Sequence, residues 1–434
     1  CKSITTINFG GDVVIIPEYL FWGCTGLTEI TIPENVQQIG GAAFIDCNAI
    51  SKITINAIKC IKMSSDNNRP AFVGAPITTV EFGPLATTIP DYAFYGCKTL
   101  TSITIPENIT AIGGAAFQNC PNLTTVIFNA RNCTVAHTIL GDNITPAFNN
   151  PAITRVEFGP LVNNIPNYIF WGCKGITDIV FGPNIETIGQ SAFYGCTSLN
   201  NITIPEGVTS IGGRAFADCK SLNTITFNAV NCVNMVTMEN NVPMPAFENK
   251  ALSAINFGNN VEIIPDYAFA NCTNLKTFNI PNSVRHIGYK AFYGCSDLES
   301  ITIPESVTTI GDDAFYNTGL IQLTIPSNVN KIGTNAFSMN KQLQTIEYKG
   351  NKNPCEGNEF QSVNQIIVRV SSAYNDNYFC GLKIEKTIDK NICGEGCYWY
   401  IDNNKLTITG TNNGKMNDFN SENEQHWSNK KDLY

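Results

Sequence analysis

The sequence predicts a solenoid built from stacked coils, each with one short β-strand. Two observations lead to this prediction. Phenylalanine recurs along the chain at nearly constant intervals, and a run of alternating apolar and polar residues follows most of these phenylalanines. A fixed period of roughly 20 to 50 residues is typical of solenoids, in which each unit packs only on its neighbours. The marker residue of each unit is Phe21, Phe44, Phe72, Phe94, Phe117, Phe148, Phe170, Phe193, Phe216, Phe247, Phe269, Phe292, Phe315, Phe337 and Phe360.

The spacing of the marker also indicates a larger duplication. Eleven of the fourteen intervals are 22 or 23 residues long, and the other three are longer. Each long interval holds an Asn-Ala-x-x-Cys phrase, ending at Cys60, Cys133 or Cys232, then a polar stretch and Pro-Ala-Phe. A block of three or four units has therefore been duplicated. We expect the polar stretches to bulge from one side of the solenoid as loops.

Residues 100–106, LTSITIP, show how one unit is built. Ile103 and Ile105 alternate with Ser102 and Thr104, which is the period-two pattern of a strand with one buried face. Pro106 cannot donate a ladder hydrogen bond, so the strand should end there. The following AIGGAAF predicts a Gly-Gly turn and a short helical or irregular return. One parallel strand per 22 or 23 residues is the rhythm of a leucine-rich repeat.

Most of the 17 cysteines follow the repeat. A small apolar side chain suits a stacked interior column, and burial suppresses thiol reactivity. We therefore predict a structural column of inert thiols. It contains the nine cysteines that follow the marker phenylalanine by three residues, namely Cys24, Cys47, Cys97, Cys120, Cys173, Cys196, Cys219, Cys272 and Cys295. Cys1 aligns with this column, and Cys60, Cys133 and Cys232 share a second repeated position.

Four cysteines near the C-terminus, Cys355, Cys380, Cys393 and Cys397, are not explained by this pattern. We expect a disulfide among Cys380, Cys393 and Cys397 if the protein is secreted, because disulfides persist in oxidising compartments. No metal site is expected, since the chain has three histidines and no pair of Cys-x-x-C motifs.

The composition excludes several partners. The net charge is −9 and the isoelectric point is near 5.0, so the chain lacks the basic face that a nucleic acid or an anionic membrane requires. No apolar run approaches the roughly 20 residues of a membrane span, and we expect no membrane insertion. The chain does not begin with Met, and its first residues align within a repeat unit, so we expect a fragment of a longer protein.

Residues 188–205, IGQSAFYGCTSLNNITIP, resemble the leucine-rich repeat of BspA-like surface proteins, which occur in mucosal bacteria and trichomonad parasites. The resemblance covers about residues 1–370 and is specific because the motif recurs fifteen times. It implies a cell-surface or secreted adhesin that binds host matrix or cell-surface proteins, glycans or other microbes.

The same resemblance divides the chain into three parts. Residues 1–370 form the solenoid, and residues 371–391 resemble the segment that closes such an array. Residues 392–434 resemble a small β-hairpin module, on the basis of Cys393, Gly394, Met416, Phe419 and Trp427. Cys397 departs from the usual form of this module.

The outward strand positions are the first candidate for a binding surface. Threonine dominates them, which also fits a solvated face made of good strand formers. The scattered charges would set specificity on a rigid platform, which loses little entropy on binding. We name as candidates Glu29, Lys52, Glu81, Thr104, Arg155, Glu157, Asp178, Lys276 and Glu299. The insertions at residues 64–69, 137–145 and 235–244 are a second candidate, because loops often carry recognition.

We expect no enzymatic activity, catalytic residue or cofactor. The sequence has no nucleophile elbow, zinc-protease helix or phosphate-binding loop. Two other functions remain open beside adhesion. The array is a structural spacer that projects another domain, or it is a targeting module for a catalytic domain elsewhere in the protein.

Overall fold

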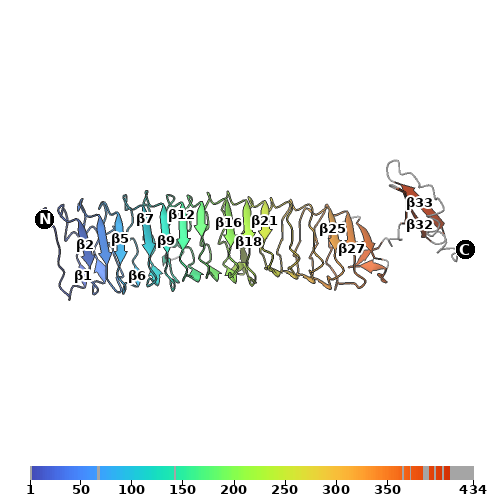
Figure 1. The fold of residues 1–434 in the computed structure, drawn as a ribbon, viewed down its shortest axis with the longest axis horizontal. Helices are drawn as coiled ribbons and strands as arrows, with labels where there is room; N and C mark the ends of the chain where they lie inside the picture. The colour runs from blue at the N-terminus through green and yellow to red at the C-terminus, as the bar shows by residue number, and fades with distance from the viewer. Residues whose placement is uncertain are drawn as a thin grey trace.

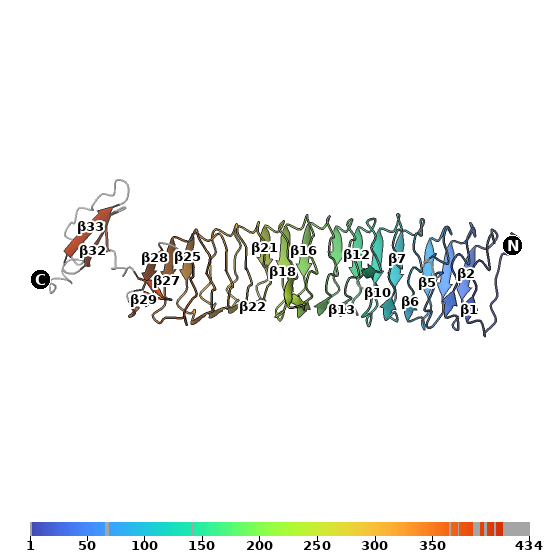
Figure 2. The ribbon, with the colours of Figure 1, turned by 180° about the vertical axis from the view of Figure 1, so that it is seen from behind.

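The computed structural model describes residues 2–65, 69–140, 143–363, 366–371, 373–384, 391–394, 397–402 and 405–410. Its coils stack along a single axis from β1 to β28, with no helix among the described residues (Figures 1 and 2). The predicted leucine-rich repeat solenoid is therefore confirmed. Cys1, Met416, Phe419 and Trp427 lie outside the described residues.

A ladder of parallel strands forms one long face of the solenoid. Inward isoleucine, valine, leucine or phenylalanine alternates with outward polar residues along most of these strands, as the sequence pattern predicts. The strands pair in the orders β2-β4-β5, β14-β12-β9-β7, β16-β18-β21 and β25-β27-β28. Their bounds are β2 Glu29–Ile32, β4 Lys52–Ile55, β5 Thr79–Phe82, β7 Ser102–Ile105, β9 Thr125–Phe128, β12 Arg155–Phe158, β14 Asp178–Val180, β16 Asn201–Ile204, β18 Thr224–Phe227, β21 Ala254–Phe257, β25 Gln322–Ile325, β27 Thr345–Tyr348 and β28 Ile367–Val370.

The ladder is interrupted between β21 and β25. The two coils there make only isolated parallel bridges, at Asn279 and Thr302, in place of three- or four-residue strands. The prediction of one strand in every coil is wrong for these two. Lys276 and Glu299 belong to these coils, so they do not lie on strands.

Most coils also have a second, two-residue strand that the sequence pattern did not predict, and the coils of Lys62, Val135, Asn234 and Cys355 have a single bridge in its place. It lies in the x-Ile part of an x-Ile-Gly or x-Ile-Pro phrase and pairs in parallel with the same position in a neighbouring coil. These strands are β1 Ile15–Ile16, β3 Gln38–Ile39, β6 Thr88–Ile89, β8 Ala111–Ile112, β13 Asn164–Ile165, β15 Thr187–Ile188, β17 Ser210–Ile211, β22 Ile263–Ile264, β23 His286–Ile287, β24 Thr309–Ile310 and β26 Lys331–Ile332. Where a glycine follows the strand, the backbone of the preceding coil lies too close to leave room for a side chain. A Cβ atom at Gly113 would lie 2.3 Å from the backbone nitrogen of Asp91 in the preceding coil.

Two of the three insertions are antiparallel hairpins, which corrects the expectation of loops. β10 His137–Leu140 pairs with β11 Asn143–Pro146, and β19 Val236–Glu239 pairs with β20 Val242–Pro245. In the first insertion, Ser64 and Pro70 form a single antiparallel bridge. The hairpins carry exposed apolar side chains: Ile139 is 59% exposed and Met238 is 58% exposed.

The marker phenylalanines form one continuous stack through the array. All fourteen neighbouring pairs have ring centroids between 4.8 and 6.5 Å apart, including the pairs that flank the insertions. Most rings are nearly parallel, with an angle of 8° between Phe193 and Phe216. Such ring pairs contribute about 0.5–1.5 kcal/mol beyond the burial of their area. The stack therefore couples every coil to the next.

The turn that carries each phenylalanine is irregular, and the helical alternative is wrong. The residue two positions before the phenylalanine has a positive φ in most coils, as at Ala115 (54°) and Tyr168 (59°). The residue two positions after it is also left-handed, as at Asn119 (57°) and Gly172 (78°). A helix cannot contain such residues at this spacing, because the left-handed conformation breaks its hydrogen-bond pattern. In most coils the phenylalanine thus lies between two left-handed residues, whereas Phe148 and Phe247 have neither.

The C-terminal region contains two further antiparallel pairings. β29 Tyr378–Phe379 pairs with β30 Leu382–Lys383 at the end of the solenoid. Residues 391–410 hold a separate three-stranded sheet of β31 Asn391–Gly394, β32 Cys397–Asp402 and β33 Lys405–Gly410. None of the described residues forms a helix long and apolar enough to cross a lipid bilayer.

Candidate binding surfaces and the cysteine column

The candidate residues of the strand face are all exposed or half-exposed. They are Glu29 of β2, Lys52 of β4, Glu81 of β5, Thr104 of β7, Arg155 and Glu157 of β12, Asp178 of β14, and Lys276 and Glu299 of the coils without longer strands. The parallel register places Glu29 beside Lys52 and Thr54 beside Glu81. The charges therefore lie in rows that run across the strands.

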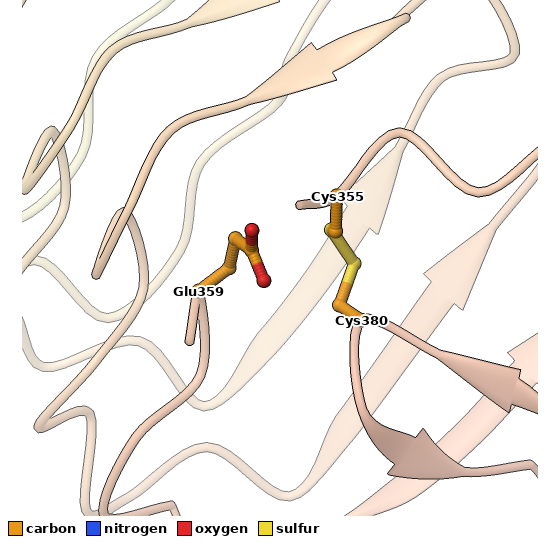
Figure 3. Close-up of side chains that lie close together, drawn as sticks. All are labelled: Cys355, Glu359 and Cys380. Carbon is orange, nitrogen blue, oxygen red and sulfur yellow. A yellow bond between two sulfur atoms is a disulfide. The ribbon is translucent and has the colours of Figure 1, made fainter. Parts of the chain in front are cut away.

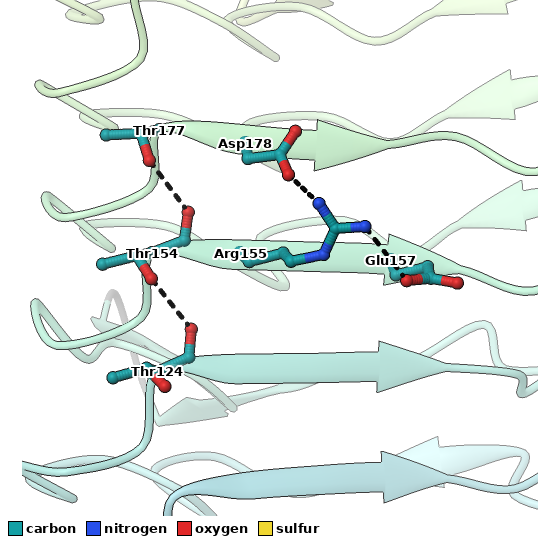
Figure 4. Close-up of polar contacts among 6 residues, drawn as sticks. All are labelled: Thr124, Thr154, Arg155, Glu157, Thr177 and Asp178. Atoms are coloured by element: carbon teal, nitrogen blue, oxygen red, sulfur yellow. Dashed lines mark hydrogen bonds and ion pairs between the residues drawn. The ribbon is translucent and has the colours of Figure 1, made fainter.

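Two charged clusters stand out on this face. In the first, the ammonium group of Lys52 lies 2.9 Å from a carboxylate oxygen of Glu81, and Thr54 donates a hydrogen bond of 3.4 Å to the same carboxylate. In the second, Arg155 forms ion pairs with Asp178 of the next strand and, at 3.3 Å, with Glu157 of its own strand (Figure 4). The side chains of Arg155, Glu157 and Asp178 are 43–49% exposed. Such exposed pairs contribute about 0–1 kcal/mol, so a ligand that offers matching charges can replace them at small cost.

Threonines at the start of the strands have a structural role. Thr154 donates its hydroxyl to the carbonyl oxygen of Thr124, and Thr177 donates to that of Thr154, both at 3.3 Å (Figure 4). The same bond recurs from Thr124 to Thr101. Part of the threonine content of this side therefore joins consecutive coils, and is not available as a ligand contact.

The nine cysteines of the column are buried and have no disulfide partner. The structure shows why their position recurs. Most of them donate the thiol hydrogen to the carbonyl oxygen of the marker phenylalanine in the preceding coil. The sulfur–oxygen distances are 3.2 Å from Cys120 to Phe94, 3.3 Å from Cys219 to Phe193 and 3.2 Å from Cys295 to Phe269, and Cys47, Cys173, Cys196 and Cys272 make the same bond. The thiol thus adds a hydrogen bond between coils to a carbonyl that, at Phe94 and Phe193, also accepts the backbone N–H of the cysteine three residues later.

One coil without cysteine uses a different residue for the same bond. Asn340 follows Phe337 by three residues and is completely buried. Its side-chain amide donates to the carbonyl oxygens of Phe315 and Phe337, both at 2.8 Å. The column position therefore does not require a reactive sulfur, and after Phe72 it holds Ala75, which is buried and has no side-chain donor.

Burial also changes the ionisation of these thiols. Loss of hydration raises the pKa of Cys47 and Cys120 to about 11, and that of Cys173, Cys219 and Cys272 to about 12. In the second repeated position, burial raises the pKa of Cys60, Cys133 and Cys232 to about 12. These thiols remain protonated at neutral pH and are poor nucleophiles.

The C-terminal disulfide differs from the expected pairing. Cys380 is joined to Cys355, with 5.2 Å between their Cα atoms, and not to Cys393 or Cys397 (Figure 3). Cys355 follows Pro354, whose carbonyl accepts the Ile332 N–H as Val135 accepts that of Ile112. Cys355 therefore occupies a repeat position after all, equivalent to Ala136. The pairing state of Cys393 and Cys397 lies outside what the structure describes.

Glu359 lies beside this disulfide and is 1% exposed (Figure 3). One carboxylate oxygen accepts the N–H groups of Glu356 and Gly357 at 2.9 and 2.7 Å, and the other has no partner. The sulfurs and the carboxylate are close enough together to hold a cation, since their ligand atoms lie within 4.8 Å of one another. Both sulfurs are bonded to each other, so as a disulfide they do not provide thiolate ligands.

Aromatic residues on the turn edge form clusters that the sequence analysis missed. They occupy the positions two before and one after the marker phenylalanine, where Tyr168, Trp171 and Tyr194 contact one another with centroids 5.8 Å apart. Further along, the ammonium group of Lys290 lies 5.0–5.8 Å from the ring centroids of Tyr267, Tyr289 and Tyr293. The recurrence of tyrosine or tryptophan directly after the marker is the signal that would have revealed this edge.

Two grooves are hollowed into the same edge. The larger has a volume of about 880 Å³ and is lined by residues between Tyr194 and Asn274. The smaller has about 580 Å³ and is lined by residues between Gly96 and Ala152. Neither groove includes a predicted strand-face residue.

The first prediction from this geometry concerns thiol reactivity. An Ellman-type reagent at pH 8 should label the buried thiols no faster than the native protein unfolds, because reaction requires an exposed thiolate. Measuring absorbance with and without urea checks this. A Thr104→Cys variant, which places a thiol on the exposed strand face, is the control and should react within minutes. Rapid labelling of most native thiols would contradict the buried column.

The raised thiol pKa values add a pH dependence. The unfolded thiols ionise near pH 9, whereas Cys60 and Cys133 in the folded protein ionise near pH 12. The stabilisation is thus complete below pH 9 and is lost as the pH rises from 9 towards 12. For each thiol, the free energy of unfolding should fall by up to about 1.4 kcal/mol per pH unit. Urea unfolding from pH 7 to 10.5 measures the slope, which should be shallower in Cys133→Ala.

The second prediction concerns the Cys355–Cys380 disulfide, which spans 25 residues. Reduction should destabilise the last coils by roughly 3 kcal/mol, because it removes a constraint on the unfolded chain. Hydrogen exchange of residues 345–384 with and without dithiothreitol measures this loss. A Cys355→Ala, Cys380→Ala double variant should not respond to the reductant. Unchanged exchange in the reduced native protein would show that the disulfide contributes nothing there.

Known structures contain similar solenoids. A leucine-rich repeat protein from Bacteroides ovatus is 25% identical, covers 83% of this chain and 88% of its own, and has a TM-score of 0.51. A leucine rich cell surface protein from Faecalibacterium prausnitzii is 23% identical, with coverage of 88% and 86% and a TM-score of 0.34. The pneumococcal vaccine antigen PcpA is 16% identical, with coverage of 89% and 83% and a TM-score of 0.37. Only the first is similar enough to support the fold.

The comparison with curated proteins finds no match to this chain. The comparison with protein families finds one that spans the whole solenoid. The BspA type leucine rich repeat region, in six copies, matches residues 1–68, 65–143, 140–237 and 240–367. These ranges cover most of the chain, and the chain therefore belongs to the BspA-type leucine-rich repeat family.

Proposed function

We propose that this chain is the non-enzymatic binding region of a cell-surface or secreted adhesin, or surface antigen, and that its strand face binds a host or microbial protein or glycan. The observation that carries the proposal is the Arg155 cluster. A guanidinium and two carboxylates, about half exposed, lie together on a face that is otherwise rich in threonine. Arginine in such a position offers a planar, charge-assisted contact to a partner.

The rigidity of the platform supports this function. The strands of the face are fixed by a parallel ladder above a core of fully buried side chains. A preorganised surface loses little conformational entropy on binding. Weak contacts spread over several coils can therefore sum to a measurable affinity. The face is long enough for this, since fifteen coils at about 4.8 Å each extend roughly 70 Å.

Family membership supports a location outside the cell. One relative with a known structure is named as a cell surface protein and another as a vaccine antigen, and both carry a similar repeat array. Beyond the solenoid, we propose that residues 371–391 close the array and that residues 392–434 form a separate small module. An extracellular location also agrees with the Cys355–Cys380 disulfide, which persists in an oxidising environment.

The third prediction tests the strand face. The chain should bind saturably to at least one member of a panel of immobilised fibronectin, laminin, collagen, mucin and defined glycans at physiological salt. Arg155→Glu combined with Lys52→Glu should weaken that binding about tenfold or more, because both changes reverse a charge that the partner would meet. Surface plasmon resonance measures the affinity, and thermal unfolding checks that the variant remains folded.

Two controls separate the faces of the molecule. Lys331→Glu makes one such charge reversal on β26, away from the strand face, and should leave the affinity unchanged. Removal of the hairpin tip at residues 239–242 should also have little effect. Loss of binding on hairpin removal alone would move the site to the insertions. No binding to any member of the panel would favour the spacer function.

A further inference from the structure

The larger groove of the turn edge differs chemically from the strand face. Its lining includes the ring of Tyr194, the small side chain of Ala217 and the amide groups of Asn271 and Asn274. Its polar and charged groups come from consecutive coils. A surface of this kind has hydrogen-bonding groups and an aromatic ring but no deep apolar cavity.

Two local features of the sequence produce the groove. Ala217 follows its marker phenylalanine by one residue, the position at which Tyr194 stands one coil earlier. The turn after Phe247 is also one residue shorter than usual, since Leu252 follows Phe247 by five residues and Leu199 follows Phe193 by six. Asn249 is buried and holds the shortened turn, because its amide donates to the carbonyl oxygen of Cys219 at 2.9 Å. The hollow is therefore built into the fold.

The smaller groove repeats the same construction. It includes Asn119 and Asn150, which precede Asp218 and Asn249 of the larger groove by 99 residues each. Asn150 is buried as Asn249 is, and donates to the carbonyl oxygen of Cys120 at 2.8 Å. The duplication of the larger block has thus placed two similar hollows on one edge of the solenoid.

The charge of the grooves is opposite to that of the chain. The larger groove is lined by three cations, Arg214, Lys220 and Lys250, and by two anions, Asp218 and Glu248, so it carries one excess positive charge. Lys98 is the one charged residue in the lining of the smaller groove. The whole chain has a net charge of −9. Within the described residues, Lys220 pairs with Asp218 at 3.7 Å, whereas no ion pair joins Arg214 or Lys250 to a carboxylate.

We propose that the larger groove binds an acidic sugar unit of a glycan. Arg214 and Lys250 are free to bind a carboxylate or sulfate group through charge-assisted hydrogen bonds. Tyr194 offers an aromatic face to the C–H groups of a pyranose ring, and Asn271 and Asn274 offer donors and acceptors to its hydroxyl groups. An acidic peptide is less well matched, because the groove has no enclosed apolar pocket for an anchoring side chain. The inference does not depend on the strand face, since no residue is shared.

The fourth prediction tests the groove with the whole chain and defined probes. Sialyllactose, a hyaluronan octasaccharide and a heparin octasaccharide supply carboxylate or sulfate groups, lactose is neutral, and a glutamate octapeptide is acidic without sugar. Isothermal titration or saturation-transfer NMR should detect at least one acidic glycan, and binding should weaken as salt is raised. Lys250→Glu and Tyr194→Ala should each reduce its affinity about tenfold, as expected for the loss of one charge-assisted or ring contact.

Lys341→Glu is the matched control. Lys341 is exposed and follows Phe337 by four residues, as Lys220 follows Phe216, but it lines neither groove. Its reversal should leave the affinity unchanged. The inference is overturned if no acidic glycan binds, if lactose or the glutamate peptide binds as tightly, or if Lys250→Glu and Lys341→Glu have equal effects. Each of these results leaves the strand-face proposal standing, because that proposal is measured with Arg155 and Lys52 variants.

Discussion

The structure depends on the stacking of one phenylalanine per coil. The rings form an unbroken column from Phe21 to Phe360, and the inserted coils at Phe72, Phe148 and Phe247 keep their places in it. In most coils the turn has a left-handed residue two positions before and two positions after the ring, a conformation that is strained for residues other than glycine; Phe148 and Phe247 have neither. Burial and stacking of the ring must outweigh that strain. The insertions lie before the marker phenylalanine and do not displace it from the stack of rings. The chain can therefore accept hairpins there without losing the repeat.

The cysteine column follows from the same turn. The carbonyl of Phe94 already accepts the backbone N–H of Cys97 in its own coil, and the thiol of Cys120 in the next coil donates a second hydrogen bond to it; Phe193 is bonded in the same way to Cys196 and Cys219. Asn340 shows that an amide can do the same. The chemistry of the thiol is therefore incidental to its position, and the raised pKa values are a consequence of burial. Among the described residues, Cys355 and Cys380 form a disulfide, which links the last coil to the segment after the solenoid.

The periodic features of this fold were predictable from sequence, and the departures from the period were not. The strand of residues 102–105 follows from strict alternation of apolar and polar residues, and its repetition identifies the solenoid. The short strand at Ala111–Ile112 has only two residues, too few for a pattern. The hairpin strand Val236–Glu239 alternates apolar and polar residues over only four positions, and its burial does not alternate, since Val236 and Thr237 are half-buried and Met238 and Glu239 are exposed. The position of Cys355 corresponds to Ala136, which is not a cysteine, so the repeat of Cys60 and Cys133 gives no sign of it. The groove depends on a one-residue deletion and a single alanine, which acquire meaning only once the coils are stacked.

Function is thereby separated from the elements that maintain the fold. Ion pairs on the strand face and cations in the turn-edge groove both lie on a scaffold whose geometry is set by the buried column, so surface residues can change without loss of the solenoid. The most direct test of this account is a double-mutant cycle on adjacent rings, with Phe193→Leu, Phe216→Leu and the double variant compared by urea unfolding. Stacking predicts a coupling of about 0.5–1.5 kcal/mol between the two positions. Changes in the free energy of unfolding that simply add would show that the rings only fill space and do not link the coils.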